Sequence, residues 1–318
     1  MGYANKVKKN CIHCQQCTQH CSFLRKYSMD LSSFAERKEL AYHCFLCGDC
    51  HRACPKHLDG TRLSQEMREE NPQGFRVMKW KKVPYKFANN SNKVSKELLF
   101  LGCNFPGYYP KTSRLLIDTF EKYQIDFSID CCGKPVYETG DSGMAQKSIQ
   151  HIINLIERKN IERLICVCPN CYYYLKDRLE IEIISIYEKL QEMGIGEKIE
   201  GQACIFQPCP DKEHEEILRS MQPFLNGYVF INSDINCCGL GGLARKWEPE
   251  LADGFLEQLE QKETKGIYTY CATCSGSLSK GANNNIKHLL SEILDVREET
   301  NQRFAHNVVS IMQYKKRR

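Results

Sequence analysis

Eighteen of the twenty cysteines in this chain fall into four ordered sets, and their spacing points to metal chemistry. Two sets share the spacing Cys-x2-Cys-x2-Cys-x3-Cys: Cys11, Cys14, Cys17 and Cys21, then Cys44, Cys47, Cys50 and Cys54. Two later sets each contain a single cysteine, a Cys-Cys-Gly and a Cys-x2-Cys: Cys103, Cys131, Cys132, Cys168 and Cys171, then Cys209, Cys237, Cys238, Cys271 and Cys274. Because thiolates this dense are suited to binding iron and sulfide, we expect a protein that carries electrons.

The N-terminal spacing is typical of ferredoxins that hold two cubane 4Fe–4S clusters. In that pattern three closely spaced cysteines bind one cluster and the fourth reaches the other. We therefore expect one cluster on Cys11, Cys14, Cys17 and Cys54, and the second on Cys44, Cys47, Cys50 and Cys21. Structural zinc also uses sets of four thiolates, but two such runs in succession favour iron.

The two later sets form an internal repeat. The single cysteine and the Cys-Cys pair are separated by 27 residues in both copies, and the following gap is 35 residues in one copy and 32 in the other. Successive side chains diverge, so a Cys-Cys pair is poorly suited to a single metal ion but can serve an extended cluster. The repeat predicts a duplication into two similar half-domains that face each other.

Short apolar runs lead into these cysteines and predict the strands that position them. We expect strands at 98–101, 163–165, 203–206 and 267–270, and helices at about 113–123, 143–158, 249–263 and 286–296. Alternation of strands and helices predicts parallel sheets covered on both faces. Ligands in such sheets bind at the carboxyl ends of the strands, where these cysteines fall.

The predicted fold is therefore α/β, with a helical N-terminal domain of the two-cluster ferredoxin type followed by two duplicated α/β modules. Helices are expected at 30–42 and 60–70, with little strand before residue 76. The predicted boundaries are 1–75 for the ferredoxin-type domain, 76–96 for a basic linker, 97–198 for the first module and 199–318 for the second.

Charge is distributed unevenly along the chain. Residues 1–96 hold 18 Lys and Arg against 8 Asp and Glu, a net of +10, while the remainder holds 26 against 31, a net of −5. The segment 71–96 contains seven cations and no acid, which fits a solvated linker, a docking face for an acidic redox partner, or peripheral contact with an anionic membrane. Bound clusters add negative charge, so we do not expect a nucleic-acid partner.

The remaining composition favours a cytoplasmic protein. No apolar run approaches the roughly 20 residues of a transmembrane helix, and the first ten residues lack the apolar core of a secretory signal. Disulfides are rare in a reducing cytosol, so we expect the cysteines to be thiolate ligands. Cys166 and Cys204 lie outside the sets, in predicted strands, and are expected to be small buried apolar residues. His288 is expected to be structural, with proton donation as the alternative.

The repeated motifs resemble the Cys-Cys-Gly (CCG) family of iron–sulfur oxidoreductases. The family includes the B and D subunits of heterodisulfide reductase and the C subunit of anaerobic glycerol-3-phosphate dehydrogenase, and the domain order here is most similar to the D subunit of heterodisulfide reductase. The matching segments are 101–103, 131–135, 168–172, 208–209, 237–242 and 271–274. Relatives commonly have His after the second Pro-Cys, where this chain has Pro210.

The resemblance implies that each complete five-cysteine set holds a noncubane 4Fe–4S cluster. The ten cysteines of the later sets would then carry the catalysis, with a small disulfide substrate between the two clusters and each half accepting one electron. The predicted function is an iron–sulfur oxidoreductase subunit that takes electrons from a flavoprotein or ferredoxin-like partner and reduces a disulfide. The alternatives are a non-catalytic conduit that couples a dehydrogenase or flavoprotein to quinone or another acceptor, and a zinc-bound interaction module.

Overall fold

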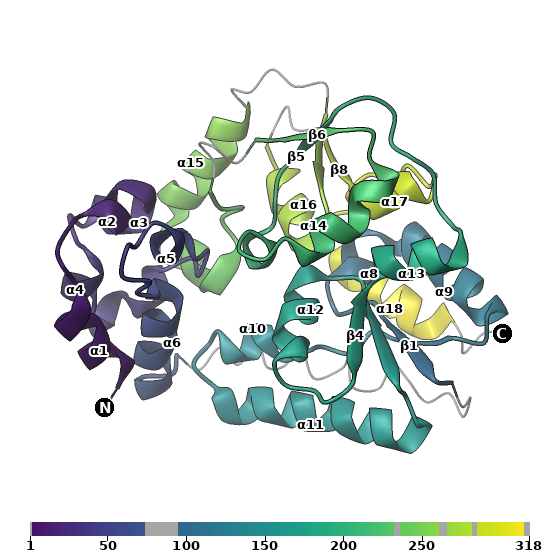
Figure 1. Cartoon of the computed structure of the whole chain (residues 1–318), viewed down its shortest axis with the longest axis horizontal. Helices are drawn as coiled ribbons and strands as arrows, with labels where there is room; N and C mark the ends of the chain where they lie inside the picture. Colours follow the sequence, from purple (N-terminus) through teal and green to yellow (C-terminus); the bar gives the residue numbers. More distant parts are fainter. Residues whose placement is uncertain (1, 74–94, 232–235, 261–265, 282–284, 315–318) are drawn as a thin grey trace.

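The computed structural model describes residues 2–73, 95–231, 236–260, 266–281 and 285–314. These residues form a helical N-terminal part and two four-stranded parallel sheets, each flanked by helices (Figure 1). The mixed α/β prediction is confirmed. Most of the predicted basic linker, residues 76–96, lies outside the described residues. Within the described ranges, no helix is both long and apolar enough to cross a membrane.

The N-terminal part is built from short helices that begin and end close to the cysteines. They are α1 (Tyr3–Asn10), α2 (Gln16–His20), α3 (Ser22–Lys26), α4 (Leu31–Phe34), the 3-10 helix η1 (Lys38–His43), α5 (Asp49–Arg52) and α6 (Gly60–Glu70). The helix predicted at 60–70 is confirmed. The helix predicted at 30–42 is wrong in extent: Asp30 caps α4 by accepting from the Ser33 N–H at 2.8 Å, and the chain leaves helical geometry at Arg37 before η1.

The two sheets have the same topology. The first contains β1 (Glu97–Phe100), β2 (Asp126–Ser128), β3 (Arg163–Cys166) and β4 (Glu182–Ser185) in the order β2-β1-β3-β4. The second contains β5 (Ala203–Ile205), β6 (Tyr228–Phe230), β7 (Ile267–Thr269) and β8 (Ile286–His288) in the order β6-β5-β7-β8. All pairs of neighbouring strands are parallel. The identical order supports a duplication into a first half, which holds β1–β4, and a second half, which holds β5–β8.

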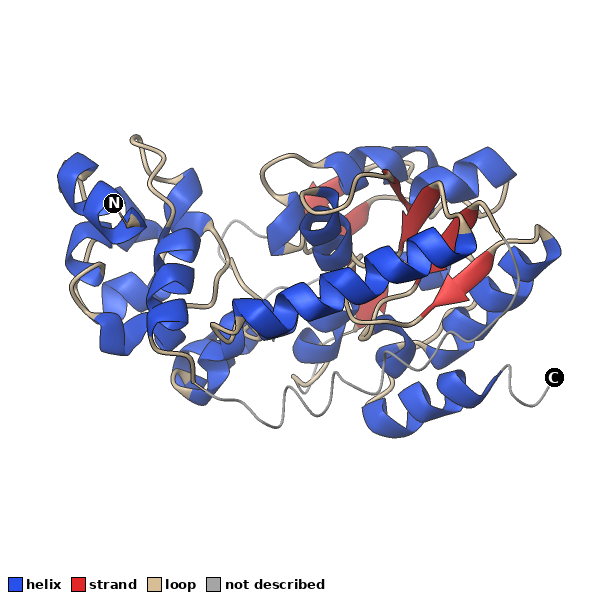
Figure 2. Cartoon of the chain, turned by 90° about the horizontal axis from the view of Figure 1, so that it is seen from below, coloured by secondary structure: helices blue, strands red, loops and turns tan. Residues whose placement is uncertain are grey.

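Helices cover both faces of each sheet (Figure 2). In the first half they include α9 (Pro110–Lys122), α11 (Ser142–Lys159), α12 (Pro169–Lys176) and α13 (Ile186–Met193), and in the second half α14 (Glu216–Met221), α15 (Pro249–Glu260), α16 (Ala272–Leu278) and α17 (Leu289–Ile293). The predictions for β1, β3, β5, β7, α9, α11 and α15 are confirmed within a few residues. The helix predicted at 286–296 is wrong at its start, because three residues form β8 before α17.

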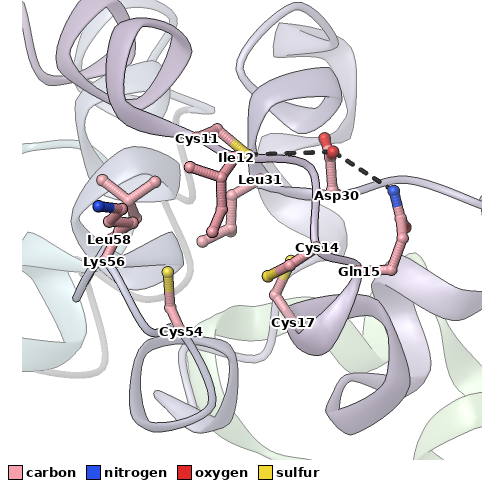
Figure 3. A pocket seen from close by; sticks show the side chains of 10 residues that line it. All are labelled: Cys11, Ile12, Cys14, Gln15, Cys17, Asp30, Leu31, Cys54, Lys56 and Leu58. Carbon is pink, nitrogen blue, oxygen red and sulfur yellow. Dashed lines mark hydrogen bonds between the residues drawn. The ribbon is translucent and has the colours of Figure 1, made fainter.

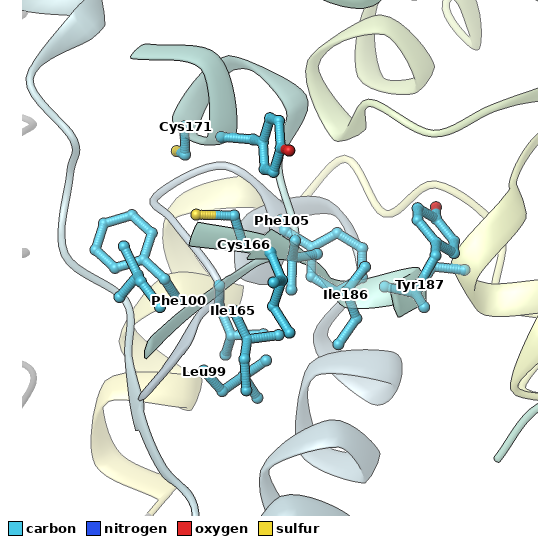
Figure 4. Packing of buried hydrophobic residues seen from close by; sticks show 14 of the residues in the cluster. Leu99, Phe100, Phe105, Ile165, Cys166, Cys171, Ile186 and Tyr187 are labelled. Atoms are coloured by element: carbon cyan, nitrogen blue, oxygen red, sulfur yellow. The ribbon is translucent and has the colours of Figure 1, made fainter. Parts of the chain in front are cut away.

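The largest described core lies in the first half and extends into the second (Figure 4). Leu99 and Phe100 of β1 and Ile165 of β3 are fully buried, as expected for central parallel strands that are covered on both faces. Cys166, the last residue of β3, is 1% exposed and packs among them, so its predicted role as a small buried apolar residue is confirmed.

The C-terminal helix α18 (Phe304–Tyr314) packs back on the first half, against α8 (Phe105–Tyr108) and α9. Asn307 donates from Nδ2 to the Gly107 carbonyl at 2.8 Å. Glu298, just before this helix, accepts from the Thr112 N–H at 2.7 Å and so caps the start of α9. The last segment of the chain therefore holds the two halves together.

Candidate cluster-binding sites

Four cysteines from the two N-terminal runs line one pocket, which we call the outer N-terminal group: Cys11, Cys14, Cys17 and Cys54 (Figure 3). Cys11 ends α1, Cys17 lies on α2, and Cys54 comes from the other run, just after α5. The fourth thiol is thus contributed by the other run, as in the predicted ligand set. Asp30 lies beside this pocket and binds His13 Nδ1 at 2.7 Å.

The other four N-terminal cysteines line a second pocket and form the inner N-terminal group: Cys21, Cys44, Cys47 and Cys50. The Leu46 N–H points at Cys44 Sγ at 3.4 Å, the kind of donor that stabilises a ligating thiolate. Burial raises the pKa of Cys21 to about 12 when no metal is bound. Cys237 and Phe255 of the second half line the same pocket, which the sequence did not predict.

The first-half group contains Cys103, Cys131, Cys132, Cys168 and Cys171. These residues follow β1, β2 and β3, so three parallel strands deliver them to one edge of the sheet. Hydrogen bonds from Cys131 and then Cys171 lower the pKa of Cys132 to about 5. Gly102 has a φ of +68°, and a Cβ there would lie 3.1 Å from Cys171 Sγ, so this turn favours glycine for both conformation and space.

The second-half group repeats this arrangement with Cys209, Cys237, Cys238, Cys271 and Cys274, which follow β5, β6 and β7. Hydrogen bonds from Cys237 and then Cys274 hold the pKa of Cys238 well below its usual value. Cys209 in turn contacts Cys237. The second cysteine of each Cys-Cys pair therefore has the same partners in both halves, as the internal repeat leads one to expect.

The two groups meet at Cys168 and Cys271, whose thiols lie close enough to interact with each other. Asn170 also points its Nδ2 at Cys271 Sγ, at 3.7 Å. Across the same boundary Asn104 donates to Thr273 Oγ1 at 2.7 Å. Neighbouring thiols therefore continue from one half into the other.

The halves exchange equivalent contacts around this junction. The segment after Cys103, α8, packs on α16, which carries the second Cys-x2-Cys. The segment after Cys209, the 3-10 helix η3 (Cys209–Asp211), packs on α12, which carries the first. Tyr173 of α12 donates its hydroxyl to Asp211, so one of three consecutive tyrosines buttresses this junction. This reciprocal packing brings the two edges together.

The N-terminal part docks on the second half through a close backbone approach. A Cβ on Gly241 would lie 2.1 Å from the Phe45 carbonyl oxygen, and Gly242 has a φ of +59° with Cys44 O 2.7 Å from its Cβ position. Only glycine fits this approach without a shift. Nearby, Glu248 of the second half is fully buried and accepts from Lys26 at 2.6 Å and Tyr27 at 2.8 Å.

Arg68 of α6 joins the N-terminal part to the first half. It is fully buried, and its guanidinium donates to the carbonyls of Ala41, Cys44 and Glu138 at 2.8–3.0 Å. Gly140 approaches the Arg68 carbonyl so closely that a Cβ would lie 2.2 Å away. The N-terminal part is therefore fixed against both halves just beyond their Cys-Cys-Gly motifs.

A buried lysine and a partly exposed one lie among the thiols. Lys212, whose side chain is 7% exposed, donates to the Asn236 carbonyl at 2.8 Å and lies 3.6 Å from Asp49 of the N-terminal part. A hydrogen bond from Cys237, with help from the Lys212 ammonium, lowers the pKa of Cys209. Lys134 follows the first Cys-Cys-Gly and pairs with Glu138. Sequence reasoning missed both lysines: the partners of Lys212 come from distant segments, and the local pair of Lys134 with Glu138 does not by itself indicate nearby thiols.

His288 does not have the environment of a proton donor. It is 1% exposed, and burial lowers its pKa to about 4, so the imidazole is neutral near pH 7. Its Nδ1 accepts from the Leu290 N–H at 3.3 Å, which places the ring proton on Nε2. These surroundings support a structural role for His288.

The donor sets fit iron–sulfur clusters chemically. All twenty cysteines are free, and eighteen of them occupy the four groups described above. Soft thiolates in sets of four or five are the ligands that such clusters use. Two of the groups also receive a backbone N–H at a sulfur, at Cys44 and at Cys237, each at 3.4 Å.

Comparison with known proteins agrees with this chemistry. The family model of the CCG cysteine-rich domain matches the chain twice, at residues 98–176 and 201–279. An uncharacterized iron–sulfur protein of Methanocaldococcus jannaschii is 22% identical over 328 residues, which cover 85% of this chain and 67% of that protein. An uncharacterized iron–sulfur protein of Methanococcus maripaludis has the same identity and coverage over 330 residues.

A third relative has a named activity. The B subunit of the fumarate reductase (CoM/CoB) of Methanothermobacter marburgensis is 21% identical over 356 residues, covering 92% of this chain and 72% of that protein. Among solved structures, the match to a glutamate racemase of Bacillus anthracis covers 70% of this chain and 83% of the racemase chain, at 13% identity. Its TM-score of 0.32 is too low to indicate a shared fold. With two matches to one domain model, the chain belongs to the CCG cysteine-rich domain family.

Proposed function

We propose that this chain is an iron–sulfur electron-transfer subunit, similar to those of heterodisulfide reductases, that delivers electrons to a disulfide. Relatives named as iron–sulfur proteins and the four thiol groups support the cofactor. The outer and inner N-terminal groups would each hold a cubane 4Fe–4S cluster within a ferredoxin-type domain of residues 1–75. The first-half and second-half groups, in modules 97–198 and 199–318, would each hold a further cluster of the noncubane kind.

The order in which the groups adjoin supports a relay. When bound, a 4Fe–4S cluster takes up and releases one electron at a time. The inner N-terminal group shares its pocket with Cys237, so it adjoins the second half. The second-half group adjoins the first-half group through Cys271 and Cys168. In this proposal the four groups form one row, from the outer N-terminal group through the inner and second-half groups to the first-half group.

The contact between Cys168 and Cys271 carries the proposed chemistry. Reduction of a disulfide, R–S–S–R′ + 2e⁻ + 2H⁺ → R–SH + R′–SH, breaks one S–S bond and needs two electrons. Two equivalent groups that meet at one junction can each supply one. The electrons would come from a flavoprotein or ferredoxin-like donor, and the protons from solvent. The free cysteines fit a reducing compartment such as the cytoplasm.

A conduit without its own substrate is the second candidate, because one relative is named as a component of a larger reductase. The two functions differ in what the isolated chain can do. A conduit would oxidise and reduce its clusters but would turn over a disulfide only with a partner protein.

Anaerobically reconstituted protein tests the proposal. Iron analysis should give about 16 irons per chain, the content of four 4Fe–4S clusters. With reduced methyl viologen as donor, a panel of disulfides that includes the CoM/CoB pair named for the fumarate reductase relative should give turnover with at least one member. Redox-active clusters with no turnover on any disulfide would favour the conduit, and a colourless, zinc-containing protein would contradict both.

A further inference from the structure

The outer N-terminal group is the solvent-facing end of the row. Of the twenty cysteines, all of which lie in the described part of the chain, Cys14 is the exposed one. Its neighbours are also open: Ile12 is 54% exposed and the His13 side chain 63% exposed. The inner N-terminal group instead shares a pocket wall with Cys237 of the second half. An external protein can therefore approach the row most closely at the outer group.

Cations outnumber carboxylates in the segment that carries this opening. Residues 2–35 contain five cations (Lys6, Lys8, Lys9, Arg25 and Lys26) and a single carboxylate, Asp30. Asp30 is 3% exposed and is already bound by His13 and by the Ser33 N–H. Lys8 pairs with the exposed Glu36 at 3.3 Å and Lys26 with Glu248 at 2.6 Å, which leaves Lys6, Lys9 and Arg25 outside the ion pairs of the described residues.

The second run adds to this charge. Lys56 is exposed and lines the pocket, on the same side as Ile12 and Leu58 in Figure 3. The Arg62 guanidinium lies 4.4 Å from the centre of the Tyr3 ring. Burial is the main cause that raises the pKa of the Tyr3 hydroxyl, and the nearby Cys54 raises it further. The nearby acids Asp59 and Glu66 accept hydrogen bonds from the backbone N–H groups of Thr61 at 2.7 Å and Ala4 at 2.9 Å. Ile12, Cys14 and Lys56 line this pocket, and the exposed Lys9 and His13 lie next to them along the chain; we call these five residues the Lys9–Lys56 face.

We infer that the Lys9–Lys56 face is the docking surface for a small acidic electron-donor protein. This inference rests on the proposed function, because it assumes a cluster on the outer group. An exposed apolar side chain in the middle and lysines at the rim form the pattern of an electrostatically steered interface. It does not depend on the basic segment 71–96, for which a docking face was one of three interpretations of the sequence.

The face is poorly suited to an anionic membrane, the other acidic surface that lysines could meet. Membrane-surface helices bury a continuous apolar stripe. On this face the large exposed apolar side chain among the described residues is Ile12. One side chain can centre a small protein interface but gives little insertion into lipid.

Stopped-flow reduction of the reconstituted protein tests the inference, with a reduced acidic ferredoxin as the probe donor. The double variant Lys9→Glu, Lys56→Glu should lower the bimolecular rate at low salt by about tenfold or more, and the difference should disappear at high salt. A matched control is Lys122→Glu, Lys147→Glu, which makes the same charge change at exposed positions of α9 and α11 and should not reproduce the loss. Iron content should be equal in all three proteins.

Reduced methyl viologen separates docking from damage to the cluster. This small cation should reduce the double variant at least as fast as the wild type, because it needs no docking surface. Equal ferredoxin rates in variant and wild type, an equal loss in the control pair, or a lysine-dependent affinity for phosphatidylserine vesicles without a rate effect would each overturn the inference. The measured reduction rate requires no disulfide. The docking inference can therefore be confirmed when no disulfide is turned over, and it can be overturned when one is.

Discussion

The thiols of Cys168 and Cys271 lie close enough to interact across the boundary between the two halves. These residues occupy equivalent positions, each the first cysteine of its Cys-x2-Cys and each just beyond the third strand of its half in chain order. The two sheet edges are equivalent and meet at equivalent residues. The first-half and second-half thiol groups therefore lie side by side. Any chemistry that needs two electrons at one place would use this junction.

Replacement of Cys271 by serine should remove the cluster of the second half. We expect iron to fall by about four atoms per chain, since serine is a poor substitute for a soft thiolate ligand. Cys166→Ala is the matched control, because Cys166 is buried near the first-half group but lies outside the four sets. Iron analysis and EPR of the reduced protein provide the measurement, and iron loss in the control alone would contradict the ligand assignment.

Replacement of Gly241 by alanine should loosen the N-terminal part from the second half. The added methyl would lie 2.1 Å from the Phe45 carbonyl, so one segment must move. We expect the free energy of unfolding to fall by about 1–3 kcal/mol, and the clusters of the halves to be reduced more slowly by a protein donor. Gly254→Ala is the control, because Gly254 lies on α15 and no atom is within 4 Å of the new Cβ. It should lower neither the free energy of unfolding nor the rate of cluster reduction. Calorimetry and stopped-flow EPR would show the difference.

Replacement of Arg68 by lysine should destabilise the protein even though the charge is kept. Lysine lacks the planar fork that reaches the carbonyls of Ala41, Cys44 and Glu138 together, and each unsatisfied buried acceptor costs about 1–3 kcal/mol. We expect the melting temperature of the reconstituted protein to drop by several degrees or more. Arg158→Lys, an exposed substitution on α11, should leave it unchanged. A similar melting temperature for both variants would contradict the role given to Arg68.

The Glu248 carboxylate should contribute stability that depends on pH. Burial acts to raise its pKa, but hydrogen bonds from Lys26, His43 and Tyr27 outweigh burial, and the pKa lies below its usual value of 4.5. A folded-state pKa below the unfolded value stabilises the protein above about pH 4.5, and this contribution is lost as the pH falls through the folded-state pKa.

Glu248→Gln tests this expectation by comparison with the wild type. The variant should be less stable at pH 7, by roughly 2–4 kcal/mol for breaking a buried charged network. The gap in melting temperature should narrow as the pH is lowered from 5 toward 4. A gap that stays constant over this range would show that the carboxylate charge does not stabilise the junction.

The sequence by itself determined the elements that lead into the cysteines. Runs such as Leu98–Leu101 before Cys103 are apolar throughout, and strands buried on both faces have that composition, so β1, β3, β5 and β7 could be predicted. Equal spacing between Cys103 and Cys131 and between Cys209 and Cys237 showed the duplication. The strands β2, β4, β6 and β8 are as short as the predicted ones, but no apolar run leads from them directly into a cysteine, so the same signal was lacking.

Only the tertiary structure decided how the four groups are ordered. Cysteine spacing specifies which thiols are close along the chain, but the neighbours of a group depend on surfaces formed by remote segments. The approach of Phe45 to Gly241 places the inner N-terminal group against the second half rather than the first. The packing of α8 on α16 and of η3 on α12 brings Cys168 to Cys271. Such contacts arise from shape and buried hydrogen bonds between distant residues, which leave no periodic signal in a single sequence.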